Sequence, residues 1–289
     1  MLPADTAAVA WWIWPIALFL TTFALGIVAV LSGVGGGVLF VPIVGSFFPF
    51  HLDFVRGTGL LLALSGALSA APSLLASGLA SLRLAMPFAL VGSVASIGGA
   101  LLGLALPAAL MQTALGITIL AIAALIWRSK RSEYPEVAAP DRLAAALQLN
   151  GVFHDAAGAR EVHWRTHRTP AGLALFAGIG LLAGMFGLGA GWANVPVLNL
   201  VLGAPLKVSV ATSGVVLSVV DTSAAWIYLH SGAVLPLMAV PSIVGVMLGA
   251  KIGARLLRVA PAATVRKLVI AMLALAGARA LLKGTGLWI

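Results

Sequence analysis

The sequence predicts an all-α integral membrane protein built from two homologous halves. Hydrophobic residues make up 61% of the chain and charged residues only 9%, whereas soluble domains carry about 25% charged residues. The apolar residues form continuous runs of about 20, long enough for a helix to cross a bilayer, and lack the alternation of a membrane β-barrel. A glycine-rich motif, Gly33-Val-Gly-Gly-Gly37 followed by Val41-Pro42, recurs 154 residues later as Gly187-Leu-Gly-Ala-Gly191 followed by Val195-Pro196.

The repeat extends well beyond this motif. In the same register and without a gap, Gly26 matches Gly180, Thr58 matches Thr212, Pro87 matches Pro241 and Gly99 matches Gly253. One unit is therefore present twice. Paired glycine breaks inside apolar sequence are typical of transporters whose substrate path lies between two repeats of inverted orientation.

Each half is expected to contribute five apolar segments. The first half gives Trp11–Leu31, Val38–Phe48, Val55–Ser77, Leu84–Leu106 and Ala109–Trp127; the second gives Gly172–Phe186, Trp192–Leu202, Val208–His230, Val234–Ala254 and Val265–Leu282. The second segment of each half has about 11 residues, which at 1.5 Å per residue covers half a bilayer. We therefore expect about eight to ten transmembrane segments, two of them half-helices that complete a broken span or re-enter the membrane. The first run lacks a basic flank and a cleavage site, so we expect it to be retained.

The chain divides into a first membrane repeat (1–127), a polar connection (128–170) and a second membrane repeat (171–289). Apolar and polar residues alternate around Leu147, Leu149 and Phe153 and again around Val162 and Trp164, with a turn between them at Asp155–Gly158. This alternation indicates a β-hairpin. The connection is expected to be either a solvated linker or a regulatory, partner-binding hairpin.

Basic residues at the segment ends predict the topology. Arg83 follows the third segment of the first half, and four cations flank the last loop of the second half: Arg255, Arg258, Arg266 and Lys267. The equivalent loops of the other half carry none, so the halves are expected to be inverted, with the connection in the cytoplasm and both termini outside. Asp53, Arg56, Arg279 and Lys283 then fall on the outer face. A nucleic-acid partner is not expected despite the net charge of +9, because the cations form no single stripe.

The glycine breaks are the first candidate site. The residues Gly35, Gly36, Gly37, Gly189, Ala190 and Gly191 leave backbone N–H groups free at the start of each short helix. A helix start carries partial positive charge and suits an anion, and the missing side chains let a small oxyanion approach the backbone. The alternative is that these glycines only allow close helix packing.

Polar side chains near the breaks are further candidates. Thr58, Thr212 and Ser213 could donate hydroxyl hydrogen bonds to an oxyanion, or bond their own helix backbone. Asn194, just inside the second short segment, could also donate to a ligand.

Asp221 is the one acid well inside an apolar segment. A buried carboxylate in a membrane must be paired, protonated or hydrated, so Asp221 is a candidate for proton coupling; the alternative is a structural hydrogen bond. No metal or cofactor is expected. The chain has no cysteine, and His163 and His167 lack the HExxH context of a zinc site.

These motifs, from Phe23 to Leu282, resemble the TauE/SafE family of sulfite exporters and related anion permeases. The shared marks are the two glycine motifs with their Val-Pro pairs, Gly57-Thr58 and Ala211-Thr212-Ser213. The resemblance implies a multi-span transporter of small sulfur oxyanions or sulfonates in a bacterial inner membrane. The chain departs from the family pattern at Ala190 and Trp192.

The leading hypothesis is therefore secondary export of a small sulfur-containing anion across the lipid bilayer. Coupling of this export to protons is part of the hypothesis. Two alternatives remain open: an anion channel, and an intramembrane enzyme. An enzyme would need a catalytic pair at membrane depth, and Asp221 stands alone there, so no enzymatic activity is expected.

Overall fold

A computed structural model describes residues 12–32, 36–76, 78–128, 135–155, 160–256 and 262–286. The helices of the first half are α1 (Ile13–Ser32), α2 (Gly36–Phe47), α3 (Leu52–Ala76), α4 (Leu82–Ala105) and α5 (Ala108–Arg128). The second half has α7 (Thr169–Phe186), α8 (Gly191–Pro196), the π-helical η2 (Val197–Val201), α9 (Leu206–His230), α10 (Pro236–Leu256) and α11 (Ala262–Gly284). Several residues of the sequence arguments lie outside the described ranges: Trp11, Gly33, Gly35, Ser77, residues 156–158 of the predicted turn, and Arg258.

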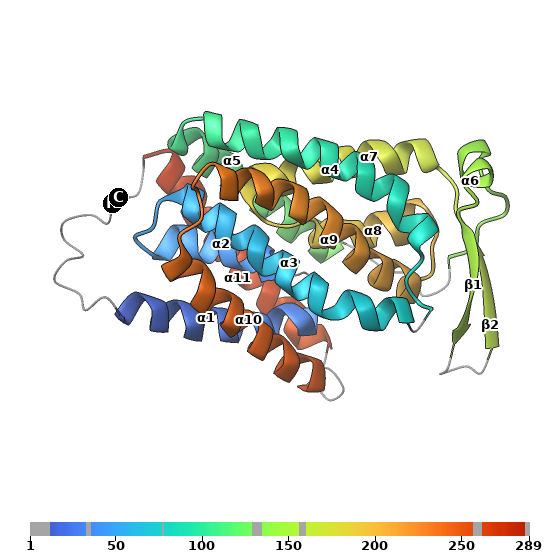
Figure 1. Cartoon of the computed structure of the whole chain (residues 1–289), viewed down its shortest axis with the longest axis horizontal. Helices are drawn as coiled ribbons and strands as arrows, with labels where there is room; N and C mark the ends of the chain where they lie inside the picture. Colours follow the sequence, from blue (N-terminus) through green and yellow to red (C-terminus); the bar gives the residue numbers. More distant parts are fainter. Residues whose placement is uncertain are drawn as a thin grey trace.

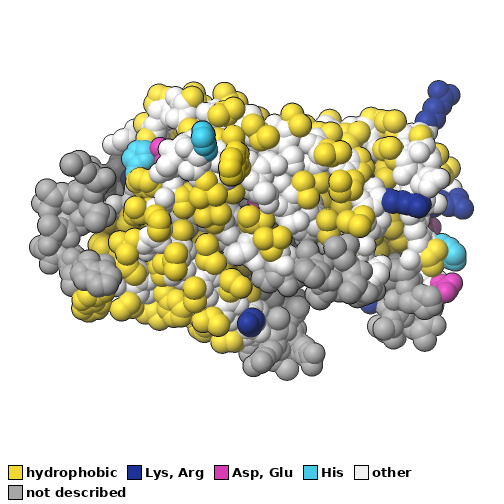
Figure 2. Space-filling view, viewed as in Figure 1, with side chains coloured by type: hydrophobic (Ala, Val, Ile, Leu, Met, Phe, Trp, Pro, Cys, Tyr) yellow, Lys and Arg dark blue, Asp and Glu magenta, His cyan; other side chains and the backbone are white. Residues whose placement is uncertain are grey.

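Every predicted apolar segment corresponds to a helix, and the prediction of an all-α membrane protein is confirmed. Within the described ranges, α4, α5, α7 and α9 each contain a stretch long and apolar enough to cross a membrane, and α1, α2 and α10 contain shorter apolar stretches. Figure 2 shows hydrophobic side chains over most of the visible face, with Lys and Arg gathered mainly at one end. On α4, Leu90, Val94 and Leu101 are exposed by 54% or more, which fits a lipid-facing surface.

The helices pair between the two halves. The helix α1 packs along α10, α4 along α7, α3 along α9, and α5 along α11 (Figure 1). Glycines allow the closest of these approaches: a β-carbon on Gly26 would lie 2.6 Å from the carbonyl oxygen of Val246, and one on Gly180 would lie 2.2 Å from that of Gly92. These two contacts are equivalent under the repeat, because Gly26 matches Gly180 and Gly92 matches Val246.

The two ends of the molecule differ. In Figure 1, α1 begins and α11 ends at the left, which we call the terminal end. The connection between the halves lies at the right, which we call the hairpin end. The short helices α2 and α8 each follow a longer helix and run back in the opposite direction.

The connection forms a small module of α6 (Arg142–Ala146), β1 (Asn150–Asp155) and β2 (Arg160–Arg165). The two strands pair antiparallel, with Asn150 opposite Arg165. Leu149 and Trp164 are buried in one apolar cluster with Leu198 and Leu202 of the η2 region. The module is therefore packed onto the membrane helices.

Asp141 fastens this module to the second half. Its carboxylate accepts from the backbone N–H of Ala144 at 3.0 Å, which caps α6, and from Thr169 Oγ1 at 2.8 Å and Thr169 N at 3.0 Å, at the start of α7. Burial acts to raise the pKa of Asp141, but these hydrogen bonds to the ionised form outweigh it, so the pKa lies below its usual value.

Candidate functional site

The two glycine breaks lie against each other. A β-carbon on Gly37, at the start of α2, would stand 2.5 Å from the carbonyl oxygen of Leu188 in the second break and 2.9 Å from that of Gly59 on α3. A β-carbon on Gly59 would in turn meet the carbonyl oxygen of Gly187 at 2.5 Å. The start of α2, the second break and the early turns of α3 therefore meet at one place.

The backbone of the second break requires glycine for two reasons. Gly187 and Gly189 have φ angles of 68° and 69°, a left-handed conformation that other residues rarely adopt. Gly187 also touches the backbone of Arg56, since a β-carbon there would stand 2.2 Å from the Arg56 carbonyl oxygen. The close-packing interpretation thus holds for Gly37 and Gly187, and it is compatible with a ligand elsewhere in the break.

Asp221 of α9 lies at this second break. The position of a β-carbon on Gly189 is 3.0 Å from Asp221 Oδ2, and the backbone amide of Ala190 lies beside the carboxyl group. Both carboxyl oxygens are buried, and no side chain within the described ranges donates a hydrogen bond to them. The sequence-predicted site residues Gly189, Ala190 and Asp221 are therefore neighbours in space.

Three more buried polar groups near the breaks lack hydrogen-bond partners in the part of the chain that the structure describes. They are Thr58 Oγ1 on α3, both amide atoms of Asn194, and Trp192 Nε1, the last two side chains being on α8. Buried polar groups are almost always hydrogen-bonded to protein or to ordered water, so these atoms can each still take up a hydrogen bond. The indole N–H of Trp192 can only donate, which suits an anion; Trp192 was not among the candidates from the sequence.

Thr212 and Ser213 lie elsewhere on α9. Thr212 Oγ1 accepts a hydrogen bond from the backbone N–H of Ser81, at 3.1 Å, next to the start of α4. Nine residues of helix separate Thr212 from Asp221, a distance of about 13 Å along the axis. The structure therefore gives Thr212 a structural partner and does not bring it to Asp221.

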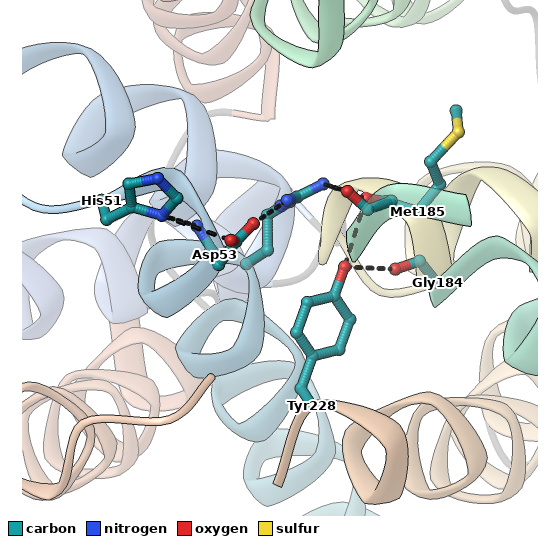
Figure 3. Close-up of polar contacts among 7 residues, drawn as sticks. His51, Asp53, Gly184, Met185 and Tyr228 are labelled. Atoms are coloured by element: carbon teal, nitrogen blue, oxygen red, sulfur yellow. Dashed lines mark hydrogen bonds and ion pairs between the residues drawn. The ribbon is translucent and has the colours of Figure 1, made fainter. Parts of the chain in front are cut away.

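The side chain of Arg56 is buried, with 2% exposed, although the residue lies at the terminal end. It pairs with Asp53, and Nη1 donates to the carbonyl oxygens of Gly103 at 2.9 Å and Met185 at 3.1 Å (Figure 3). Tyr228 OH donates to the carbonyl oxygen of Gly184 at 3.0 Å. Because α7 ends at the second break, its last carbonyl groups have no hydrogen-bond donors within the helix. The guanidinium of Arg56 and the hydroxyl of Tyr228 donate to these carbonyls instead.

Two other cations of the terminal end hold α2 in a similar way. The guanidinium of Arg279 lies 4.1 Å from the ring centroid of Phe47, and Lys283 Nζ is 3.4 Å from the carbonyl oxygen of Gly45. Positive charge near a helix C-terminus is stabilising. The cations that the topology rule leaves at the outer face therefore support the ends of α2 and α7.

The chain matches a known protein family over nearly its whole length. Residues 18–280 match the family described as Sulfite exporter TauE/SafE. A curated relative, the probable membrane transporter protein YunE of Bacillus subtilis (strain 168), is 30% identical over 132 residues, which cover 46% of this chain and 48% of the relative. The match thus spans about half the length of that relative. No solved structure matches the chain.

Proposed function

The chain belongs to the TauE/SafE sulfite exporter family, and on that basis we propose that it is a secondary transporter that exports a small sulfur-containing anion such as sulfite or an organosulfonate. It is a multi-pass membrane protein of a transporter family. Its location in a bacterial inner membrane is part of the proposal.

The observation that carries the proposal is the meeting of the two breaks beside unpartnered polar groups. The anion is placed between Gly35–Gly37 and Gly189–Gly191. Thr58, Asn194 and Trp192 supply neutral donors whose hydrogen bonds are unmet within the described ranges. Neutral donors and backbone amides bind an oxyanion without trapping it, as a transport cycle requires. Thr212 and Ser213 stay predicted contacts of the repeated site, although Thr212 bonds Ser81 in this conformation.

An inverted repeat is the proposed basis of alternating access. Under the repeat, α1 corresponds to α7 and α10 corresponds to α4, so the packing of α1 on α10 is equivalent to the packing of α7 on α4. This equivalence supports an inverted repeat, as does that of the Gly26–Val246 and Gly180–Gly92 contacts. In this arrangement the hairpin end faces the cytoplasm and the terminal end faces outward. The two repeats would then rock about a fixed site between the breaks.

Coupling to protons is assigned to Asp221. An ionised carboxylate beside Gly189 repels a bound anion, and protonation removes this repulsion, so the protonation of Asp221 is coupled to anion binding. Few charged groups lie near Asp221 in the described ranges. Asp53 and Arg56 lie beside Tyr228, which is about 10 Å from Asp221 along the axis of α9. Arg83 lies in the first turn of α4, at the hairpin end. The described helices α7 and α8 carry no charged residue.

Uptake into proteoliposomes tests the proposal. The panel is sulfite, sulfate, thiosulfate, sulfoacetate and taurine, each measured with and without a pH gradient. Saturable, gradient-dependent uptake supports a carrier. Uptake that rises linearly with anion concentration and ignores the gradient would favour the anion channel.

A further inference from the structure

Arg56 is the one Lys or Arg with a fully buried side chain in the part of the chain that the structure describes. Burying a cation at membrane depth is costly, and such residues face the bundle interior and pair with an anion. Arg56 meets this demand through Asp53, while its Nε atom has no hydrogen-bond partner among the described residues. Arg56, the one fully buried cation among the described residues, is thus paired with a carboxylate of its own chain.

The carboxylate is the accessible member of this pair. Asp53 is 27% exposed at the terminal end, whereas Arg56 is 2% exposed. The Oδ2 atom of Asp53 also lies 3.3 Å from His51 Nδ1, a nitrogen that accepts a hydrogen bond from the backbone N–H of Asp53. It stands in the first turn of α3, where the helix dipole favours negative charge. Asp53 can therefore leave the guanidinium without becoming an isolated charge.

Arg56 also lies between the terminal end and the proposed site. Its backbone touches Gly187, and its guanidinium bonds the carbonyl of Met185, two residues before that glycine. Thr58, whose buried hydroxyl lacks a partner within the described ranges, follows two residues later on α3. The guanidinium therefore lies next to the second break.

We propose that Arg56 is an anion-contact residue on the outer part of the pathway, where a small oxyanion takes the place of the Asp53 carboxylate on the guanidinium. The inference rests on the proposed function and extends its site toward the terminal end. A guanidinium presents paired donors that match two oxygens of a sulfite or sulfonate group. The tethered carboxylate competes for the same donors, so the anion is held briefly and released.

The test compares three variants of the purified full chain in proteoliposomes and in detergent. The measurements are the KM for sulfite uptake and the thermal stabilisation of the protein by sulfite. Asp53→Asn removes the competitor and is expected to lower the KM several-fold and to increase stabilisation by sulfite. Arg56→Lys keeps the charge without the fork, and is expected to raise the KM by about tenfold. Arg83→Lys, at an exposed cation of the hairpin end, is the control and is expected to leave both values unchanged.

A purely structural ion pair gives a different pattern. If Arg56 only caps α7, then Asp53→Asn weakens the protein and brings no gain in sulfite affinity, and that result overturns the inference. If the unaltered protein takes up sulfite, and Asp53→Asn and Arg56→Lys take it up with the same KM as the unaltered protein, this inference is overturned. The proposed function is not affected by that result. Failure of the unaltered protein to bind or transport any anion of the panel overturns the proposed function, and this inference with it.

Discussion

Asp221 of α9 lies against Gly189 in the second glycine break, with Oδ2 3.0 Å from the position that a β-carbon on Gly189 would take. The matching position in the first half is Ala67, so the acid is present in one repeat only. The two breaks are therefore chemically different although their glycines are repeated. We propose that both breaks bind the anion and that proton coupling depends on the second break, where Asp221 lies.

The first prediction concerns this carboxylate. Asp221→Asn keeps the shape of the side chain and removes its charge and its proton exchange. We expect saturable anion uptake to persist while its dependence on a pH gradient disappears. Initial uptake rates with and without an imposed gradient provide the measurement. An unchanged response to the gradient would make Asp221 a structural residue.

The second prediction concerns space at the second break. A larger side chain on Gly189 meets Ala63 Cβ at 2.7 Å and Asp221 at 3.0 Å, on a backbone with φ of 69°. Gly189→Val is therefore expected to abolish uptake, and Gly36→Val, which meets only Val246 Cγ2 at 3.2 Å, to reduce it less. Gly98→Val is the matched control, because no described atom lies within 4 Å of its β-carbon position. Normal uptake by correctly inserted Gly189→Val protein would show that Gly189 does not line the anion site and serves only helix packing.

The third prediction concerns Asp141 at the hairpin end. Its carboxylate caps α6 and bonds Thr169, so Asp141→Ala is expected to cost about 1 kcal/mol of stability. Because its pKa is lowered in the folded protein, its contribution is present above the usual pKa of 3.8 and is lost as the pH falls below that value. Melting temperatures between pH 6 and pH 3 should converge for the variant and the unaltered protein at the acid end. Glu136→Gln, at an exposed carboxylate of the same connection, should behave as the unaltered protein does throughout.

The fourth prediction concerns topology. With inverted halves, a reporter after residue 289 is exposed on the outer side, and a reporter inserted in the turn between β1 and β2 is cytoplasmic. Paired fusions of a phosphatase that acts outside and a fluorescent protein that folds inside distinguish the two faces. A C-terminal reporter that is active only in the cytoplasm would contradict five crossings in each half.

The helices could be predicted because hydropathy and length are local properties of the sequence. The meeting of the two breaks was expected from the repeat, since equivalent elements of an inverted pair face each other across the same site. The short α6 could not be predicted, because five residues are too few to show a helical period.

The burial of Arg56 also lies beyond what local sequence conveys. An Asp and an Arg three residues apart at the start of a helix are typical of an exposed pair. Only the tertiary contact with the end of α7 gives the guanidinium its carbonyl partners at Gly103 and Met185. Trp192 was missed for a related reason: an aromatic residue in apolar sequence resembles ordinary core until its N–H is seen to be buried without a partner in the described ranges.

The central claim is that the meeting breaks hold a small sulfur-containing anion, and Asn194 tests it most directly. Both amide atoms of Asn194 are buried without partners in the described part of the chain, so Asn194→Leu removes donors that only a ligand would use and should not destabilise the fold. The measurement is the initial rate of sulfite and sulfoacetate uptake into proteoliposomes as a function of concentration. We predict saturable uptake of at least one of these anions by the unaltered protein, and a loss of at least about tenfold in kcat/KM in Asn194→Leu. Equal saturable uptake by the two proteins would contradict the claim.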